Sequence, residues 1–267
     1  MHNKFKLTFN SLFSITITAI MLAATPLQAQ AKESILSDDW QFDAHIYIWA
    51  PAFSGEMDIA DGVPFDVPFS DLVDNLKMGF YGSFEARHQK WLIYTDIVYL
   101  NVETDAAPPA PPTIKPDISF RNVQMDGGAI NLIGGYNLLV KGRSRLDLIA
   151  GARYLDLGSE FGLNVIFLGE TTTKFIPIDL GTALDAIIGV KGKYAFGNRW
   201  SIPYHADIGA GDSDLTWQLI SGISYQAADW VDLALTYRHM EWDLKSTDGL
   251  IKNVNFSGPA VGATFHF

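Results

Sequence analysis

The stretch VNFSGPAVGATFHF, residues 254–267, decides the fold of this chain because its side chains alternate in character with a period of two. Counting back from the end, one parity is apolar and holds Phe267, Phe265, Ala263 and Val261. The other parity holds the small or polar residues His266, Thr264 and Gly262. Successive side chains of a β-strand point to opposite faces, so this pattern predicts a strand with one apolar face.

The same alternation recurs along the chain. We find ten segments of this kind, near residues 40–50, 77–88, 91–102, 118–139, 145–157, 183–196, 199–211, 214–227, 230–243 and 254–267. Strands of globular proteins usually have about 5–6 residues, whereas strands that cross a membrane need about 9–11. Lipid offers no hydrogen bonds, so every strand edge must be paired. The sequence therefore predicts an all-β fold, a transmembrane antiparallel β-barrel of about ten strands.

Two alternatives stay open for the fold. Residues 158–182 can form a hairpin turning at Gly169 and Glu170, which either lengthens its neighbouring strands or gives a twelve-strand barrel. A soluble periplasmic sandwich is the rival at the level of the fold, and the long strands argue against it.

The connections between the segments alternate in length. Long connections cover residues 51–76, 103–117 and 158–182, whereas links such as Gly197-Asn198 and Ala228-Asp229 are tight. Outer-membrane barrels have short periplasmic turns and longer external loops. With an even number of strands, the first and the last strand of the chain then both have their free ends on the periplasmic side.

Composition excludes several classes of protein. The 267 residues contain no cysteine, so the chain has no disulfide framework, cysteine zinc site or thiol nucleophile. The formal net charge is -11, which argues against nucleic acid as a partner. Charged residues make up 18%, where about 25% is usual for soluble domains.

The N-terminus reads as an export signal. Lys4 and Lys6 precede a short, largely apolar stretch that Pro26 ends, and Ala29-Gln30-Ala31 fits a small-x-small cleavage site. We therefore expect residues 1–31 to be a signal peptide and residues 32–267 to form the barrel domain.

The last strand also resembles the C-terminal signature of bacterial outer-membrane proteins, through Phe265 and the terminal Phe267. Four further stretches resemble a mostly uncharacterised group of small proteobacterial outer-membrane barrels of the OmpA-transmembrane and OmpW-like type: 69–80, 151–154, 213–218 and 235–238. The resemblance implies residence in the bacterial cell outer membrane, with outer-membrane lipid and lipopolysaccharide as partners. It also implies that barrel-assembly machinery reads the two phenylalanines. It implies no activity, and the oligomeric state stays unknown.

The polar parity predicts what fills the barrel. We expect a lumen charge network of Asp43, Glu85, Arg87, Asp96, Asp147, Arg153, Asp185, Lys191, Asp207 and Arg238. Charges in a narrow lumen persist only when they are paired or hydrated. Ile133, Ile149 and Leu155 depart from the pattern because they fall on the polar parity.

The first long loop is acidic. Its carboxylates form a possible cation-binding loop, in which divalent ions would bridge to lipopolysaccharide: Glu56, Asp58, Asp61, Asp66, Asp71 and Asp74. Their spacing matches no EF-hand, and a solvated acidic loop is the alternative. We expect a short amphipathic helix over residues 70–76, and a stiff proline-rich segment over residues 106–112 in the next loop.

These features favour a non-enzymatic barrel with an envelope-structural or surface-interaction role, without cofactor or metal. A narrow channel for small solutes is the first alternative. A hydrolase at the outer rim is the second, since Asp212, Asp214, His239 and Glu241 would lie near the outer strand ends and could activate water.

Overall fold

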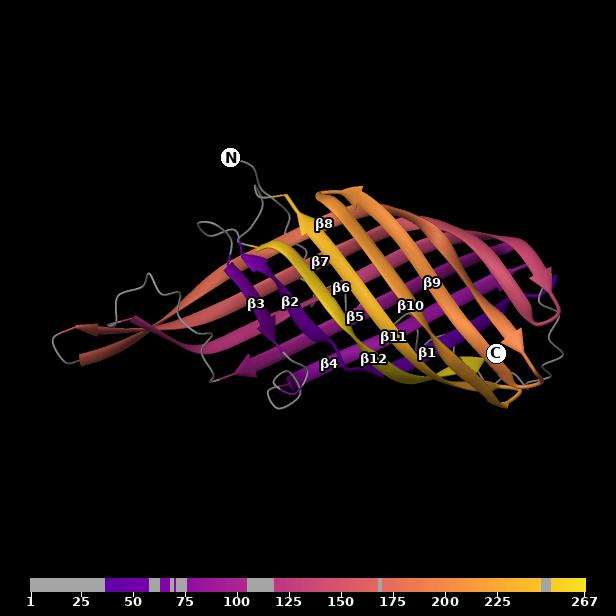
Figure 1. Cartoon of the computed structure of the whole chain (residues 1–267), viewed down its shortest axis with the longest axis horizontal. Helices are drawn as coiled ribbons and strands as arrows, with labels where there is room; N and C mark the ends of the chain where they lie inside the picture. Colours follow the sequence, from indigo (N-terminus) through magenta and orange to yellow (C-terminus); the bar gives the residue numbers. More distant parts are fainter. Residues whose placement is uncertain are drawn as a thin grey trace.

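The computed structural model describes residues 37–57, 63–67, 70, 76–104, 118–167, 170–245 and 251–267. Within these ranges the chain forms twelve β-strands (Figure 1). Their bounds are β1 Gln41–Trp49, β2 Ala52–Met57, β3 Val63–Val67, β4 Leu76–His88, β5 Trp91–Thr104, β6 Ile118–Lys141, β7 Ser144–Phe167, β8 Glu170–Phe196, β9 Trp200–Gly211, β10 Ser213–Ala228, β11 Val231–Leu244 and β12 Ile251–His266. The expected signal peptide lies outside the described residues.

The strands close into an antiparallel barrel. The wall runs β1–β4–β5–β6–β7–β8–β9–β10–β11–β12, and β12 pairs back to β1. After the break at Ala50 and Pro51, β2 continues along β12 in the place of β1, and β3 pairs with β2 as an extra strand. The barrel therefore has ten strand positions, which confirms the prediction.

The segment 158–182 lengthens two strands of the wall. The β7–β8 ladder runs without interruption from Arg145 opposite Lys193 to Phe167 opposite Glu170, with a single register shift near Gly158. Figure 1 shows this hairpin reaching beyond the rest of the wall, at the end opposite the C-terminus. The hairpin interpretation is therefore correct, and the twelve-strand count is not needed.

Tight turns lie at the barrel end that carries the C-terminus. Gly142 and Gly197 adopt φ values of 60° and 69° in two of these turns, a left-handed conformation that glycine takes without steric cost. At the other end the connections that follow β1 and β5 are long, whereas those between β7 and β8 and between β9 and β10 are short. By the rule for outer-membrane barrels, the end with the short turns faces the periplasm.

The outer face of the wall is apolar. Its exposed side chains include Ile46, Ile48, Leu132, Leu184, Ile188, Ile208, Leu235 and Val261. Aromatic pairs bridge neighbouring strands at the periplasmic end, as in Trp91 with Tyr136 and Trp200 with Tyr225. Such a band with an aromatic girdle matches a lipid-facing surface. No helix within the described ranges is long and apolar enough to cross a membrane.

The apolar residues that broke the polar parity lie inside the barrel. Ile133 and Ile149 pack with Leu92, Tyr94 and Ile187 in the lumen. Leu155 belongs to a second, larger cluster nearer the outer end. The expectation that paired charges largely fill the lumen is thus incomplete, because apolar layers separate and cover the charged ones.

Candidate functional site: the barrel lumen

The middle of the lumen is built around Arg153 of β7. Its guanidinium donates from Nε to Asn131 Oδ1 at 2.8 Å and from Nη1 to Thr216 Oγ1 at 3.1 Å. Its Nη2 atom makes an ion pair with Asp207 Oδ1 at 2.6 Å. The side chains of Arg153 and Asp207 are both fully buried. Burying a charge in this way requires such complete pairing.

A second arginine reaches in from β11. Arg238 Nη2 lies 2.5 Å from Asp96 Oδ2 on β5 and 2.6 Å from Gln218 Oε1 on β10. Its Nη1 donates to Tyr47 Oη at 2.6 Å, and the Tyr47 hydroxyl donates to Asp96 Oδ1 at 2.8 Å. Arg238 therefore ties together strands from distant parts of the wall.

Polar amides join the two arginine centres into one network. Asn131 Nδ2 donates to Asp96 Oδ2 at 3.2 Å, and Gln218 Nε2 donates to Asp207 Oδ2 at 3.1 Å. His205 Nε2 lies 2.7 Å from the same Asp207 oxygen. We call this group the mid-lumen network: Tyr47, Asp96, Asn131, Arg153, His205, Asp207, Thr216, Gln218 and Arg238.

Another charged group lies nearer the periplasmic end. Arg87 Nε contacts Glu85 Oε1 at 2.5 Å, and its Nη2 contacts Asp147 Oδ2 at 2.6 Å. Glu85 is also bound by Arg145 Nη2 at 3.1 Å and Lys191 Nζ at 2.9 Å. We call these five residues the periplasmic cluster. It holds three cations against two carboxylates.

At the periplasmic end of the lumen, His266 of β12 lies between two carboxylates. Its Nδ1 atom is 2.7 Å from Asp43 Oδ1, and its Nε2 atom is 3.4 Å from Asp232 Oδ2. Asp43 thus pairs with a histidine. Within the described ranges it does not pair with a lysine or an arginine of the predicted lumen charge network.

Asp185 differs from the rest of the predicted network. Its carboxylate is fully buried and accepts hydrogen bonds at 2.8 Å from both the backbone N–H and the hydroxyl of Ser213. Its partners at the start of β10 are therefore uncharged, whereas the sequence predicted a pair with a lysine or an arginine.

A cavity of about 170 Å³ lies in the periplasmic half of the lumen. Its lining includes residues of both charged groups and of the His266 site, among them Asp43, Lys191, His205, Asp232 and Arg238. Side-chain exposure falls with depth, from 24% at His266 and Asp43 to 2% at Arg238. This gradient indicates that solvent enters from the periplasmic end and stops at the mid-lumen network.

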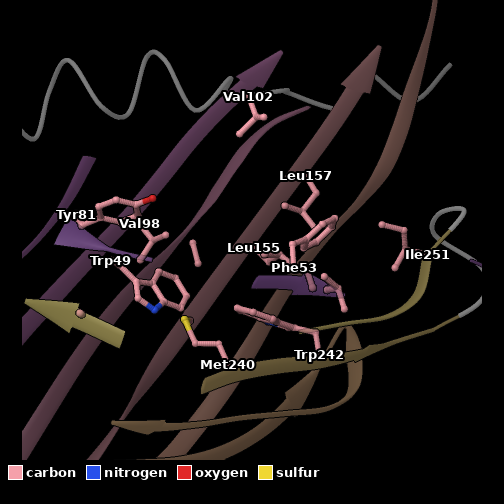
Figure 2. Packing of buried hydrophobic residues seen from close by; sticks show 14 of the residues in the cluster. Trp49, Phe53, Tyr81, Val98, Val102, Leu155, Leu157, Met240, Trp242 and Ile251 are labelled. Atoms are coloured by element: carbon pink, nitrogen blue, oxygen red, sulfur yellow. The ribbon is translucent and has the colours of Figure 1, made fainter. Parts of the chain in front are cut away.

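The outer half of the lumen is an apolar plug. Trp49 of β1, Phe53 of β2, Leu155 of β7, and Met240 and Trp242 of β11 converge there, and Figure 2 shows them close together. The remaining space is a cavity of about 40 Å³. The two arginines of the mid-lumen network face this plug, because Arg153 lies 5.6 Å from the Trp242 ring and Arg238 lies 5.2 Å from the Trp49 ring.

The acidic first loop is described in part. Glu56 on β2 pairs with Lys252 Nζ at 3.0 Å, and Asp66 is exposed on β3. Asp58, Asp61, Asp71 and Asp74 lie outside the described residues, as do most of the expected helix at 70–76 and the proline-rich segment. The described part of the chain contains no group of three or more potential metal ligands.

The proposed rim residues do not form one site. His239 Nε2 lies 3.2 Å from Glu241 Oε2, and His239 Nδ1 lies 2.5 Å from Ser257 Oγ. Both β11 residues have the outward parity, so this group sits on the outside of the wall. Asp212 instead accepts a hydrogen bond from the Leu184 backbone, and no contact joins it to His239 among the described residues.

Sequence reasoning missed the uncharged members of the mid-lumen network and the plug. Asn131, Thr216 and Gln218 all have lumen parity, and so do Trp49 and Trp242. Parity alone would have found them if the uncharged and aromatic residues of the polar parity had been counted as lumen residues along with the charged ones.

No family model and no curated protein matches the chain. Among solved structures, the outer-membrane protease OmpT from Escherichia coli aligns at 11% identity and a TM-score of 0.47, over 88% of this chain and 99% of that one. The translocator domain of the autotransporter NalP from Neisseria meningitidis aligns at 12% identity and a TM-score of 0.38, over 97% and 96%. Ail from Yersinia pestis, solved with the heparin analogue sucrose octasulfate, aligns at 8% identity and a TM-score of 0.36, over 86% and 100%.

The chain's own geometry identifies its class of protein. A closed antiparallel wall presents apolar side chains outward and buries its charges inside. All connections at one end are tight turns, and the long connections lie at the other end. The chain is a small β-barrel of the bacterial outer membrane.

Proposed function

We propose that this protein is a plugged barrel with a structural role in the outer membrane, and that its external loops make its surface contacts. The observation that carries this proposal is the mid-lumen network, which links β1, β5, β6, β7, β9, β10 and β11 across the lumen. Its members are all nearly or fully buried. The apolar plug then covers the network on its outer side.

Both layers oppose passage of solutes. A hydrated solute would have to displace Arg153 from Asp207 and Arg238 from Asp96, and each separation would leave buried charges unpaired. It would also have to cross a dry layer around Trp242. These costs favour a structural role over the narrow channel.

Planar-bilayer recording tests the proposal. Purified barrel, checked by heat-modifiable gel migration, is expected to give no stepwise conductance. The charge swap Arg153→Glu is expected to lower stability without creating conductance steps. Discrete conductance of the unaltered protein that changes with Arg153→Glu or Asp207→Lys would replace the structural role with a channel.

A cellular readout complements the recording. Loss of the protein is expected to increase uptake of a detergent or apolar dye by the cell, and the plasmid-borne chain is expected to restore the barrier. Unchanged permeability in the absence of the protein would contradict a structural contribution to the envelope.

The His239 group supports a second candidate function, hydrolysis of a lipid ester at the outer wall. His239 contacts both Ser257 and Glu241. Ser257, His239 and Glu241 are of the residue types that serve as nucleophile, base and orienting carboxylate, respectively. Release of fatty acid from phospholipid vesicles, lost in both Ser257→Ala and His239→Ala while the folded barrel persists, would establish it. Absence of hydrolysis by the unaltered protein would exclude it for those lipids.

The proposed structural role includes the two partners that the sequence suggested. Lipopolysaccharide would contact the acidic first loop through divalent ions, and barrel-assembly machinery would recognise Phe265 and Phe267. The terminal backbone supports this assignment, because Phe267 and Phe42 exchange two backbone hydrogen bonds while the Phe267 side chain stays exposed. Phe267→Ala is expected to reduce outer-membrane assembly in cells and leave the stability of the assembled barrel unchanged.

A further inference from the structure

The periplasmic cavity has unsatisfied polar atoms in its walls. Five buried side-chain nitrogen or oxygen atoms in the described ranges have no hydrogen-bond partner. Four belong to residues that line this cavity: Arg145 Nε, His205 Nδ1, Asp232 Oδ1 and Arg238 Nε. Buried polar groups are normally hydrogen-bonded, so their concentration around one space marks that space as a site for a polar occupant, either water or a ligand.

The atoms without partners include both donors and an acceptor. Arg145 Nε and Arg238 Nε can only donate, whereas the ionised Asp232 Oδ1 can only accept. His205 and Arg238 are more than nine-tenths buried, which places their groups deep in the cavity. An occupant that satisfies all of these atoms must therefore present acceptors and donors together.

Near its periplasmic opening the cavity has cations on one wall and carboxylates on the other, whereas the deeper Arg238 of β11 is paired with Asp96. Arg145 and Lys191 lie on β7 and β8, and the periplasmic cluster around them has one more cation than carboxylate. Asp43 and Asp232 lie on β1 and β11, across the ring from β7. His266 connects these two carboxylates at distances of 2.7 and 3.4 Å.

We propose that this periplasm-facing cavity binds a small zwitterion of the α-amino acid class. The carboxylate of the ligand would face Arg145 and Lys191, and its ammonium group would face Asp43 and Asp232. The cavity of about 170 Å³ has the space of about five or six waters, which corresponds to a solute with a similar number of non-hydrogen atoms. The site goes beyond the structural role, because binding at a blind pocket needs no open lumen.

The experiment observes the arginine Nε–H groups directly. The chain is produced in cells fed with ¹⁵N-arginine and purified from their outer membranes in detergent, and Arg145→Lys and Arg238→Lys assign the two resonances. The probes are L-alanine, propionate, which lacks the ammonium group, and ethylammonium, which lacks the carboxylate. We expect L-alanine to shift both resonances to saturation, and each half-probe to bind about tenfold more weakly or worse.

Two variants locate the ammonium subsite. Asp232→Asn keeps the size of the side chain and removes its charge, so the affinity for L-alanine is expected to fall to that of propionate. Asp229→Asn, which makes the same change at an exposed turn residue nearby, is expected to leave binding unchanged. If Asp232→Asn loses heat-modifiable migration, Arg145→Gln tests the opposite wall, with loss of discrimination between L-alanine and ethylammonium expected.

Three results would overturn the proposal. Equal affinity for L-alanine and propionate would make the cavity a plain anion site. Shifts that never saturate with any probe would mean that the cavity holds water alone. Full L-alanine affinity in the folded Asp232→Asn variant would remove the ammonium subsite. Conductance measurements are independent of all three, so failure here leaves the plugged barrel untouched.

Discussion

The two halves of the lumen solve the problem of filling a ten-strand barrel in different ways. The outer half packs tryptophan, methionine and aliphatic side chains around a cavity of about 40 Å³. The periplasmic half lines a cavity of about 170 Å³ with charged residues. Of the five buried polar atoms without partners among the described residues, the outer half holds one, Trp242 Nε1, and the other four border the periplasmic cavity. The outer half excludes solvent by packing, and the periplasmic half admits it.

This difference follows from the cost of burying charge. Lys191 and Arg145 keep side-chain exposures of 19% and 16%, so water contributes to their solvation. Arg153 and Asp207 have no exposure and depend on each other. The mid-lumen network therefore marks the boundary at which hydration ends and exact pairing becomes necessary.

The largest effect is expected when this boundary loses a charge. Arg153→Met leaves Asp207 buried with only His205 and Gln218 as partners, and the free energy of unfolding should fall by about 3–5 kcal/mol. Urea unfolding of the barrel in lipid vesicles measures the change.

The matched control removes both charges. Arg153→Met combined with Asp207→Leu should recover most of the lost stability, because replacing a buried ion pair with apolar residues is often neutral. A loss below about 1 kcal/mol in the single variant would mean that water reaches this depth, and the contrast between the halves would fail.

Truncations on one strand sharpen the comparison of packing. Met240 and Thr236 both lie on the lumen face of β11, Met240 in the plug and Thr236 beside the periplasmic cavity. Met240→Ala should cost about 2–5 kcal/mol because it leaves an empty space in a dry layer. Thr236→Ala should change stability by about 0.5 kcal/mol or less, since water fills the gap. Equal losses in the same unfolding assay would show that both halves are packed alike.

Most of the fold could be predicted from the sequence, because every barrel strand follows the same alternation of apolar and polar side chains. The alternation of Leu184 and Ile188 with Asp185 fixes which face meets lipid, and the terminal phenylalanines fix the last strand. The hairpin at 158–182 was harder to predict, since its residues alternate whether they extend two strands or form two more. Only the register, with Glu160 opposite Pro177, decides between these outcomes.

The site was less accessible from sequence because its contacts cross the lumen. Parity places Arg238 and Asp96 inside, but their sequence positions give no sign that they meet at 2.5 Å. The stagger of the strands around the barrel decides that meeting, and it also puts Arg153 beside Asp207 instead of its ladder neighbour Asp185. The plug is hard to predict for a different reason, because Trp49 and Trp242 have the polar parity, on which the sequence predicts charged residues and not apolar packing.

The smallest effect is expected in the periplasmic cluster, where pairing is redundant. Lys191→Met removes one of three cations around Glu85, but Arg87 and Arg145 remain at 2.5 and 3.1 Å. The variant also loses a cation–π contact with Tyr94 at 4.4 Å, while the methionine stem keeps the apolar packing. For a partly hydrated pair of this kind we expect a loss below about 1 kcal/mol, smaller still at high salt because the charges are screened. Urea unfolding at low and high salt measures both quantities. A loss as large as that of Arg153→Met, unaffected by salt, would place Lys191 in a dry interior and would remove the distinction between a hydrated half and a sealed one.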